Sequence, residues 1–289
     1  MESKRKYAQS VRQKLLNFAN ENNDDFQMIL TRYGLERLIA RISQSKYKNS
    51  FILKGAMLFQ IWSETNHRAT RDVDFLSFGS NDVVKIKETF ISICKIEIPE
   101  DGIIFEIKNI FAGKIKADQK YEGVRIHIPA LLERTRITIR IDVGFGDAIV
   151  PEAREHELST LLDFPSPVIR TYSQETVIAE KFQALVDLGF TNSRLKDFYD
   201  LYFLITNFEY DEEILTKAIE TTFENRQTKI PNQIPIGLTE EFSKDKDKML
   251  QWKSFLKKTN VSVEISLEEI VKILRNFFTD LLPQLNKEN

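Results

Sequence analysis

FILKGAMLFQIWSETNHRATRDVDFLSFGS, residues 51–80, joins an apolar run to a glycine and then to a pair of carboxylates. The residues after Gly55 are typical of a helix, and those around Asp72 and Asp74 are typical of a strand. Side chains alternate along a strand, so both carboxylates leave one face while the apolar Val73 leaves the other. A segment otherwise built for burial therefore places two acids on a single face.

The bulk composition predicts a folded protein without a strong charge bias. The chain has 289 residues, of which 42% are hydrophobic and 29% charged, and its net charge is -2. These values exclude a disordered chain and predict one large or two smaller domains. The near-zero net charge gives no global signature of nucleic-acid binding. With one cysteine, Cys94, and three histidines, neither an internal disulfide nor a zinc site is expected.

Hydrophobic periodicity predicts a mixed α/β first part. Helices are expected near the N-terminus, over residues 25–43 and over residues 82–96, and strands over residues 102–111 and 121–130. The clearest strand is residues 136–147, RITIRIDVGFGD, in which isoleucines alternate with Thr138, Arg140 and Asp142.

The second part of the chain is expected to be helical. Pro165 and Pro167 predict a linker. Beyond it, a capping box from Thr171 is expected to begin a helix that Gly189 ends, and another from Ser266 begins the last helix. We therefore predict an α+β domain at residues 1–163, with a mixed sheet flanked by helices, and a helical domain at residues 164–289.

The pair Asp72 and Asp74 has two interpretations. Two acids on an edge strand are commonly no more than its solvent-facing side, and an isolated D-x-D pattern occurs often by chance. The alternative is a cation site, because neighbouring carboxylates repel each other unless a positive charge lies between them. Mg²⁺ is typically held by one or two carboxylates together with substrate phosphates.

Two further features favour the cation site. Gly55 follows an apolar strand and precedes a helix, an arrangement that suits phosphate binding. Asp142 lies on the polar face of a separate strand. If that strand pairs beside the one carrying Asp72 and Asp74, three carboxylates converge, as in sites that bind two metal ions for phosphoryl transfer.

The order of these motifs resembles the polymerase-β-type nucleotidyltransferases. More narrowly, FILKGAMLF, RATRDVDF, IRIDV, AEKFQAL and RLKDFYDLY together resemble the AbiEii/AbiGii family of nucleotidyltransferase toxins, which act in bacterial toxin–antitoxin and abortive infection systems. The resemblance extends from about residue 25 to residue 206. It implies a nucleotidyltransferase-fold domain followed by a helical domain.

The resemblance also implies roles for individual residues. Asp72, Asp74 and Asp142 would be metal ligands and catalytic residues, and Lys181 would be catalytic and contact nucleotide phosphates. Lys54, Gly55 and Ala56 would belong to the first nucleotide-binding motif. Asp197 and Asp200 match a D-x-x-D motif that would contribute, with Lys181, to the cleft. From spacing alone, those two acids could equally pair with Arg194 or Lys196.

The implied activity is the transfer of NMP from an NTP to an acceptor, with two Mg²⁺ ions for which Mn²⁺ could substitute. As a toxin, the protein would modify the 3′ end of tRNA and be opposed by an antitoxin encoded by a neighbouring gene. The alternatives are nucleotidylation of a protein or small molecule, and an inactive interaction module of the same fold. Basic surface for RNA is limited to residues 244–258 and to Lys46, Lys48 and Lys54. We expect a cytoplasmic monomer without a membrane segment.

Overall fold

The computed structural model of the protein describes residues 2–63, 67–68, 70–115, 123–259 and 265–286. The chain divides into two compact units. Unit 1 comprises Met1–Gly146 and Arg154–Thr171, and unit 2 comprises Asp147–Ala153 and Tyr172–Asn289. Residues 164–171, which the sequence suggested as the start of the second domain, therefore lie in unit 1.

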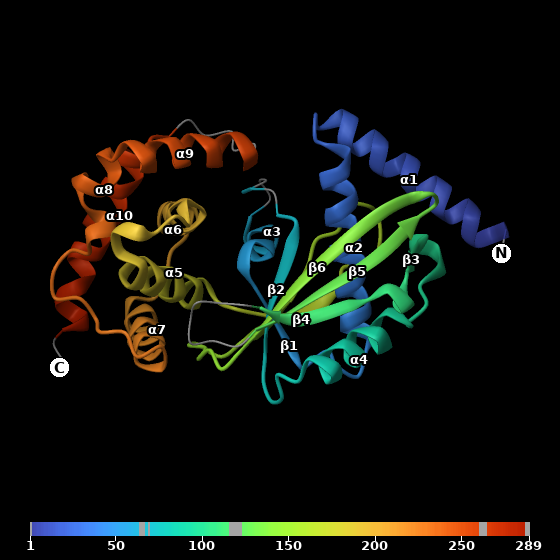
Figure 1. Ribbon diagram of the computed structural model, residues 1–289, viewed down its shortest axis with the longest axis horizontal. Helices are drawn as coiled ribbons and strands as arrows, with labels where there is room; N and C mark the ends of the chain where they lie inside the picture. Colours follow the sequence, from blue (N-terminus) through green and yellow to red (C-terminus); the bar gives the residue numbers. More distant parts are fainter. Residues whose placement is uncertain (1, 64–66, 69, 116–122, 260–264, 287–289) are drawn as a thin grey trace. The chain divides into compact units, whose positions relative to one another are not determined.

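Unit 1 is built on one mixed sheet (Figure 1). Its strand order is β3-β5-β6-β2-β1-β8-β7, and β4 also pairs with β5. The strands are β1 (Phe51–Lys54), β2 (Asp72–Ser77), β3 (Ile103–Phe105), β4 (Phe111–Ile115), β5 (Gly123–Leu132), β6 (Thr135–Phe145), β7 (Arg154–Glu157) and β8 (Val168–Thr171). The central strand β2 is antiparallel to β1 and parallel to β6. The fold class predicted from the sequence is confirmed.

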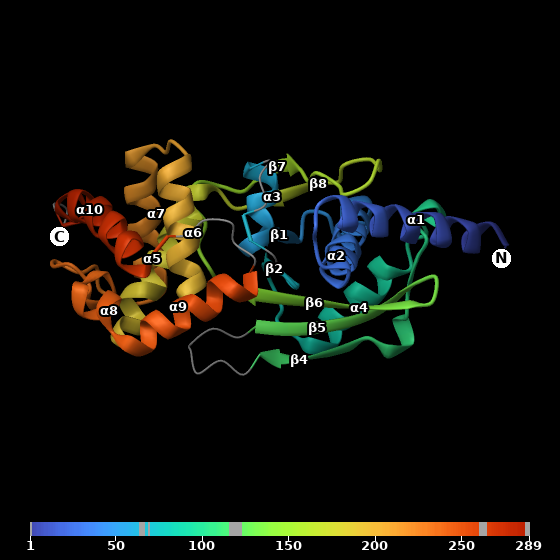
Figure 2. The ribbon, with the colours of Figure 1, turned by 90° about the horizontal axis from the view of Figure 1, so that it is seen from above.

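Helices cover the apolar face of this sheet. Unit 1 contains α1 (Glu2–Glu21), α2 (Phe26–Gln44), α3 (Phe59–Trp62) and α4 (Val83–Cys94). In Figures 1 and 2, α2 lies against β6, and α4 lies against β4 and β5. Gly34 of α2 permits close approach, because a Cβ there would lie 3.1 Å from Ile137 and Ile139 side-chain atoms. Along β6 these isoleucines are buried while Thr138 is exposed, as the alternation predicts.

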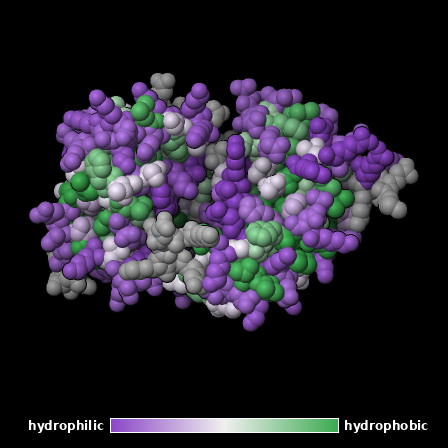
Figure 3. Space-filling view, viewed as in Figure 1, coloured by the Kyte–Doolittle hydropathy of each residue, from purple (hydrophilic) through white to green (hydrophobic). Residues whose placement is uncertain are grey.

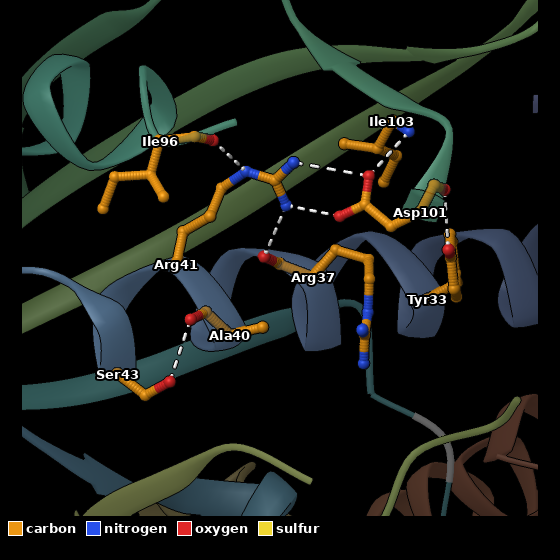
Figure 4. A network of polar contacts seen from close by, with 8 residues as sticks. All are labelled: Tyr33, Arg37, Ala40, Arg41, Ser43, Ile96, Asp101 and Ile103. Atoms are coloured by element: carbon orange, nitrogen blue, oxygen red, sulfur yellow. Dashed lines mark hydrogen bonds and ion pairs between the residues drawn. The ribbon is translucent and has the colours of Figure 1, made fainter. Parts of the chain in front are cut away.

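A buried ion pair attaches α2 to the turn before β3 (Figure 4). Arg41 donates to Asp101 through Nη1 at 2.6 Å and Nη2 at 3.3 Å, and its Nε donates to the Ile96 carbonyl at 2.9 Å. Tyr33 donates to the carbonyl of Asp101 at 2.7 Å. Because the guanidinium and the carboxylate are each almost fully buried, their mutual hydrogen bonds compensate the loss of hydration.

The strand β8 lies in the stretch for which the sequence predicted only a linker. It follows Pro165 and Pro167. It pairs in parallel with β1 and antiparallel with β7. Proline lacks a backbone N–H and rarely occurs inside a sheet. Here both prolines precede the first strand residue, so β8 keeps its backbone N–H donors. Residues 168–171 are therefore a strand of unit 1, where the sequence predicted a linker.

Unit 2 is helical among its described residues. Its helices are α5 (Gln174–Leu188), α6 (Leu195–Asn207), α7 (Glu212–Asn225), α8 (Glu240–Lys244), α9 (Lys246–Thr259) and α10 (Leu267–Leu285). The predicted capping box from Ser266 to Glu269 is present, and Gly189 is the C-cap of α5. The cap predicted at Thr171 is wrong. Thr171 ends β8, and Ser173 caps α5 by accepting a hydrogen bond from the Thr176 N–H.

Aromatic side chains form much of the core of unit 2. The rings of Phe182 on α5 and Phe278 on α10 stack with centroids 3.9 Å apart, and Phe198 stacks on Phe242 at 5.2 Å. Hydrophilic residues cover most of the molecular face in Figure 3. No helix in the described part of the chain is long and apolar enough to cross a bilayer.

Candidate functional site

The three carboxylates of unit 1 lie on one face of two adjacent strands. Parallel pairing of β2 with β6 places Asp74 directly beside Asp142, and Asp72 beside Arg140. Neighbouring strands are about 4.8 Å apart, so the side chains of Asp74 and Asp142 leave the sheet within contact range. Val73, between the two acids of β2, is fully buried on the opposite face. The strand pairing that the sequence analysis required is present.

Gly55 lies directly against Asp74. Its backbone has a φ of +75°, and a Cβ at this position would be 2.2 Å from Asp74 Oδ2. Both the left-handed conformation and the absence of a side chain are therefore needed here. Ala56 follows in a short 3₁₀ helix, Gly55–Leu58, that leads into the single turn of α3. The predicted helix thus begins at Gly55 but ends after only two short elements.

Two arginines hold two of the three carboxylates. Arg125 of β5 donates to Asp142 from Nε at 2.7 Å and from Nη2 at 2.6 Å. Arg140 of β6 donates through Nη2 to Asp72 Oδ2. The Thr70 hydroxyl lies 2.9 Å from Asp72 Oδ1. Asp72 is therefore positioned by contacts from its own segment and from the neighbouring strand.

Electrostatics join the arginines to the whole group of acids. The hydrogen bond to Asp142 raises the pKa of Arg125 above its ordinary value, and the charges of Asp142, Asp72 and Asp74 raise it further. On the other side of β2, Lys54 is the strand neighbour of Asp74. Three acids thus share this face of the sheet with three bases.

The donor atoms on this face have the chemistry of a magnesium site. Carboxylate oxygens are the preferred protein ligands of Mg²⁺ and also suit Mn²⁺. Among the residues that the structure describes, however, no group of three or more His, Cys, Asp or Glu side chains is arranged to hold a metal ion. Asp72 and Asp142 are turned towards Arg140 and Arg125 instead. The residue types and the strand register of Asp72 and Asp142 fit a divalent cation. In their present rotamers, both carboxylates accept hydrogen bonds from the arginines.

A cavity of about 550 Å³ lies beside the first motif, within unit 1. Its lining includes Ala56, Gln60, Trp62, Arg32 and Arg68. The volume is within the range of small-molecule sites, and the two guanidinium groups suit an anionic ligand. Of the predicted nucleotide-binding residues, Ala56 is the one that lines this cavity.

Lys181, Asp197 and Asp200 form a buried cluster in unit 2. The Lys181 ammonium lies 2.7 Å from Asp197 Oδ1 and 2.7 Å from Asp200 Oδ2. Arg194 adds a contact of 2.8 Å from its Nε to Asp197 Oδ2. The side chain of Lys181 is 12% exposed, against 2% and 1% for the two acids. In this arrangement the two acids hold the lysine, and its side chain is more accessible than either of theirs.

The charge state of Asp197 depends on its two basic partners. Burial by itself would raise the pKa of this carboxyl, but the positive charges of Lys181 and Arg194 outweigh that effect. The pKa of Asp197 is therefore held below its ordinary value. The cluster thus pairs two acidic side chains, Asp197 and Asp200, with two basic ones, Lys181 and Arg194.

The predicted site residues thus fall into two groups. Unit 1 brings together Lys54, Gly55, Asp72, Asp74 and Asp142, with Ala56 next to them in the chain. Unit 2 brings together Lys181, Asp197 and Asp200. The roles assigned to these residues by the family resemblance stay predictions.

Sequence reasoning named Arg194 as a possible partner of Asp197, which the structure confirms, but it did not identify the partners of Asp72 and Asp142. Arg125 and Arg140 occupy polar positions of alternating strands, and that alternation was the available signal. In unit 2, Arg226 contacts Asp147 at 2.8 Å and Glu180 at 3.1 Å, and it donates to Gln183 at 2.9 Å. No spacing in the sequence predicts this second network.

The lysine-rich stretch 244–258 is less basic as a surface than its composition suggests. Lys248 is buried, donates to the Asn192 carbonyl at 2.8 Å and lies over the rings of Phe190 and Phe242. Lys244 pairs with Glu240 at 2.8 Å. These two lysines are therefore occupied by contacts within unit 2.

Comparisons with known proteins agree with the motif order. The model of the nucleotidyl transferase AbiEii toxin family, of a type IV toxin–antitoxin system, matches residues 37–273. The structure of JHP933 from Helicobacter pylori is similar, with a TM-score of 0.52 and 19% identity over 90% of this chain and 94% of that one. A second H. pylori structure, described as a candidate nucleotidyltransferase, has a TM-score of 0.50 and 18% identity over 90% of this chain and 97% of that one.

At these identities the two structures establish the fold alone, and a search of curated proteins gave no match. The family model covers most of the chain and includes both groups of candidate residues. The protein belongs to the AbiEii family of nucleotidyl transferase toxins.

Proposed function

We propose that this protein is a divalent-metal-dependent nucleotidyltransferase that transfers NMP from an NTP to an acceptor hydroxyl. The observation that carries the proposal is the register of β2 with β6, which sets Asp74 beside Asp142 with Asp72 two residues away. Gly55 makes room for the Asp74 carboxylate, which a side chain at residue 55 would displace. Family membership supports the same class of reaction.

In the proposed reaction, the acceptor oxygen forms a bond to the α-phosphorus of the NTP. The bond from that phosphorus to the bridging oxygen breaks, and pyrophosphate leaves. Asp72, Asp74 and Asp142 would hold two Mg²⁺ ions, or Mn²⁺ in their place, and the ions would neutralise the charge of the triphosphate. Asp142 would also receive the proton of the acceptor hydroxyl.

Lys181 is proposed to act on phosphate as a point charge, as lysines do at many phosphate sites. Asp197 and Asp200 support this role indirectly, because they hold the lysine at 2.7 Å each and fix its position. We therefore propose that the two acids position Lys181 and do not themselves contact the nucleotide.

We further propose that the acceptor is the 3′ end of tRNA and that a cognate antitoxin opposes the activity. The AbiEii family supports the antitoxin, since its description names a toxin of a type IV toxin–antitoxin system. The tRNA acceptor is proposed from the motif resemblance described above. Blocking the 3′ end of tRNA would stop translation, so a single modification per tRNA molecule would be enough for toxicity.

The test is a transfer assay with each α-labelled NTP, Mg²⁺, and either tRNA, total cell protein or candidate small molecules as acceptor. We expect label on tRNA with the wild-type protein, and at least about a 100-fold loss with Asp72→Ala, as for removal of a group that acts in the transition state. Thr138→Ala is the matched control, because Thr138 is exposed on the same face of β6 and two residues from Arg140. Full activity of Asp72→Ala would refute the mechanism.

The three kinds of acceptor in this assay distinguish the alternative functions. Label on protein or on a small molecule, with none on tRNA, would replace the tRNA proposal and keep the enzyme class. If no NTP with Mg²⁺ raises the melting temperature and no acceptor is labelled, the protein is an interaction module of this fold. Ligands that bind the native state stabilise it by mass action, which makes the melting temperature a direct check.

A further inference from the structure

Arg125 and Arg140 face the candidate metal ligands from neighbouring strands. Antiparallel pairing of β5 with β6 sets Arg125 beside Asp142, and parallel pairing of β2 with β6 sets Arg140 beside Asp72. Arg125 engages both oxygens of Asp142, at 2.7 and 2.6 Å. The strand register itself therefore brings one guanidinium to each of two acids.

These arginines are not locked in a core. The side chains of Arg125 and Arg140 are 41% and 39% exposed, whereas those of Asp142 and Asp72 are 18% and 29% exposed. A long side chain with that much contact with water can swing outward at small cost, since ion pairs at partly exposed positions contribute little to stability. The short aspartate side chains stay close to their strands, whereas the guanidinium groups can move away from the carboxylates.

A divalent cation and a guanidinium that bind the same carboxylate repel each other through their positive charges. A metal ion at Asp72 and Asp142 would therefore weaken the contacts of Arg140 and Arg125 with these acids and favour rotamers in which the two arginines turn away. Their roots on β6 and β5 keep both guanidinium groups next to the same face. There they would meet the phosphates of a bound nucleotide, and the planar fork of arginine matches phosphate oxygens.

We propose that Arg125 and Arg140 are exchange residues: they neutralise Asp142 and Asp72 in the metal-free protein and pass to the nucleotide phosphates when cations bind. This inference rests on the proposed function, because it takes the three aspartates as the metal ligands. It adds to that function two phosphate-binding residues, and it explains why the acids do not form a preassembled metal group among the described residues.

The exchange predicts opposite effects of one substitution on two ligands. Removing the guanidinium removes a competitor of the metal, so Arg125→Gln and Arg140→Gln should bind Mn²⁺ alone about threefold more tightly or better. The same variants lose phosphate hydrogen bonds, so at saturating Mn²⁺ they should bind a non-hydrolysable NTP analogue about tenfold more weakly. A role limited to holding β5 and β6 together predicts no tightening of metal binding.

The experiment measures Mn²⁺ binding by electron paramagnetic resonance and analogue binding by calorimetry, on the full-length protein. Arg136→Gln is the matched control, because Arg136 is exposed on the same face of β6, four residues before Arg140. We expect it to match the wild type in both assays. Arg125→Lys retains the charge but not the fork. It should bind Mn²⁺ with nearly wild-type affinity and the analogue with intermediate affinity.

Asp74→Asn distinguishes a failure of the arginine exchange from a failure of the proposed function. If it abolishes Mn²⁺ binding while Arg125→Gln and Arg140→Gln bind Mn²⁺ no more tightly than the wild type, the exchange is refuted and the proposed function stands. If the wild type and Asp74→Asn bind Mn²⁺ equally, the aspartates are not the metal site, and the proposed function fails together with the exchange. If the glutamine variants do not fold, the Arg125→Lys result decides, and unchanged analogue affinity refutes the exchange.

Discussion

At residue 55, both the backbone and a neighbouring carboxylate exclude a side chain. The φ of +75° is in the left-handed region, and a Cβ would lie 2.2 Å from Asp74 Oδ2. Gly55→Ala therefore has to displace the Asp74 carboxylate. Misplacing a catalytic group by about 1 Å can lower a rate by about 100-fold, so we expect a loss of nucleotidyl transfer of that order. The measurement is the initial rate with saturating NTP.

Gly79→Ala separates this effect from simple backbone strain. Gly79 also has a positive φ, +99°, but a Cβ there would meet no atom within 4 Å. Both variants should lose about 1–2 kcal/mol of unfolding free energy to the left-handed conformation. Only Gly55→Ala should also lose nucleotidyl-transfer activity, because only there does the new side chain displace Asp74. Equal activities of the two variants would show that the contact with Asp74 has no functional role.

Residue patterns in the sequence predicted the positions of the acids better than their partners. The alternation around Asp72, Asp74 and Asp142 specifies the face of each strand, because side chains leave a strand with a period of two. It does not specify which strands are neighbours. The pairing of Asp142 with Arg125 depends on the adjacency of β5 and β6, which no local pattern encodes.

At the scale of elements, α5 and α6 are joined by the cluster of Lys181, Asp197 and Asp200. Removing one partner of a buried ion pair typically costs about 3–5 kcal/mol, because the remaining charge has lost its compensation. The cluster therefore contributes to the stability of unit 2 as well as to the position of Lys181. A functional assay on its variants has to be accompanied by a measurement of stability.

The stability due to Asp197 should depend on pH. Its pKa is lowered in the folded state, so the stabilisation is present above the unfolded-state pKa of about 3.9 and is lost as the pH falls through the lower folded-state pKa. Asp197→Asn should cost about 3 kcal/mol at pH 7. The difference in unfolding free energy between wild type and variant should shrink below about pH 4.

Urea unfolding between pH 7 and pH 3 measures this difference. Asp280→Asn, at an exposed position of α10, is the control and should follow the wild type throughout. A difference between wild type and Asp197→Asn that stays constant from pH 7 to pH 3 would contradict the ionic role of the Asp197 carboxylate.

Local signals in the sequence predicted α5 and α10, and failed where two caps competed for the start of α5. Thr171 and Ser173 both precede α5, and the sequence analysis assigned the cap to Thr171. Pairing of β8 with β1 draws Thr171 into the sheet, so Ser173 caps the helix instead. A parallel strand partner lies far away in sequence, which is why a local capping motif could not exclude Thr171.

At the scale of the whole molecule, the change from α/β to helical composition predicted two parts of the chain. The path between the two units was not predictable, because residues 147–153 belong to unit 2 and residues 154–171 belong to unit 1. Short segments such as these carry too few residues for a periodic pattern. Their assignment depends on contacts such as that of Arg226 with Asp147.

The two units contain separate spectroscopic and chemical probes, which allow a test of their independence. Cys94 in unit 1 is the only cysteine of the chain, and burial raises the pKa of its thiol to about 12. It should therefore react with a thiol reagent only after unit 1 unfolds. Trp252 in unit 2 is buried, and its indole donates to the Ile265 carbonyl at 2.9 Å. With Trp62 replaced by phenylalanine, tryptophan fluorescence reports on unit 2 alone.

Lys181→Met in the Trp62→Phe background should destabilise unit 2 and leave unit 1 unchanged. We expect the urea midpoint of the Trp252 signal to fall, with a loss of about 3 kcal/mol or more, because two buried carboxylates lose their shared cation. The midpoint for labelling of Cys94 should stay at its value in the parent protein, since compact units with their own cores can unfold separately. Equal shifts of both midpoints would mean instead that the two units unfold as one cooperative structure.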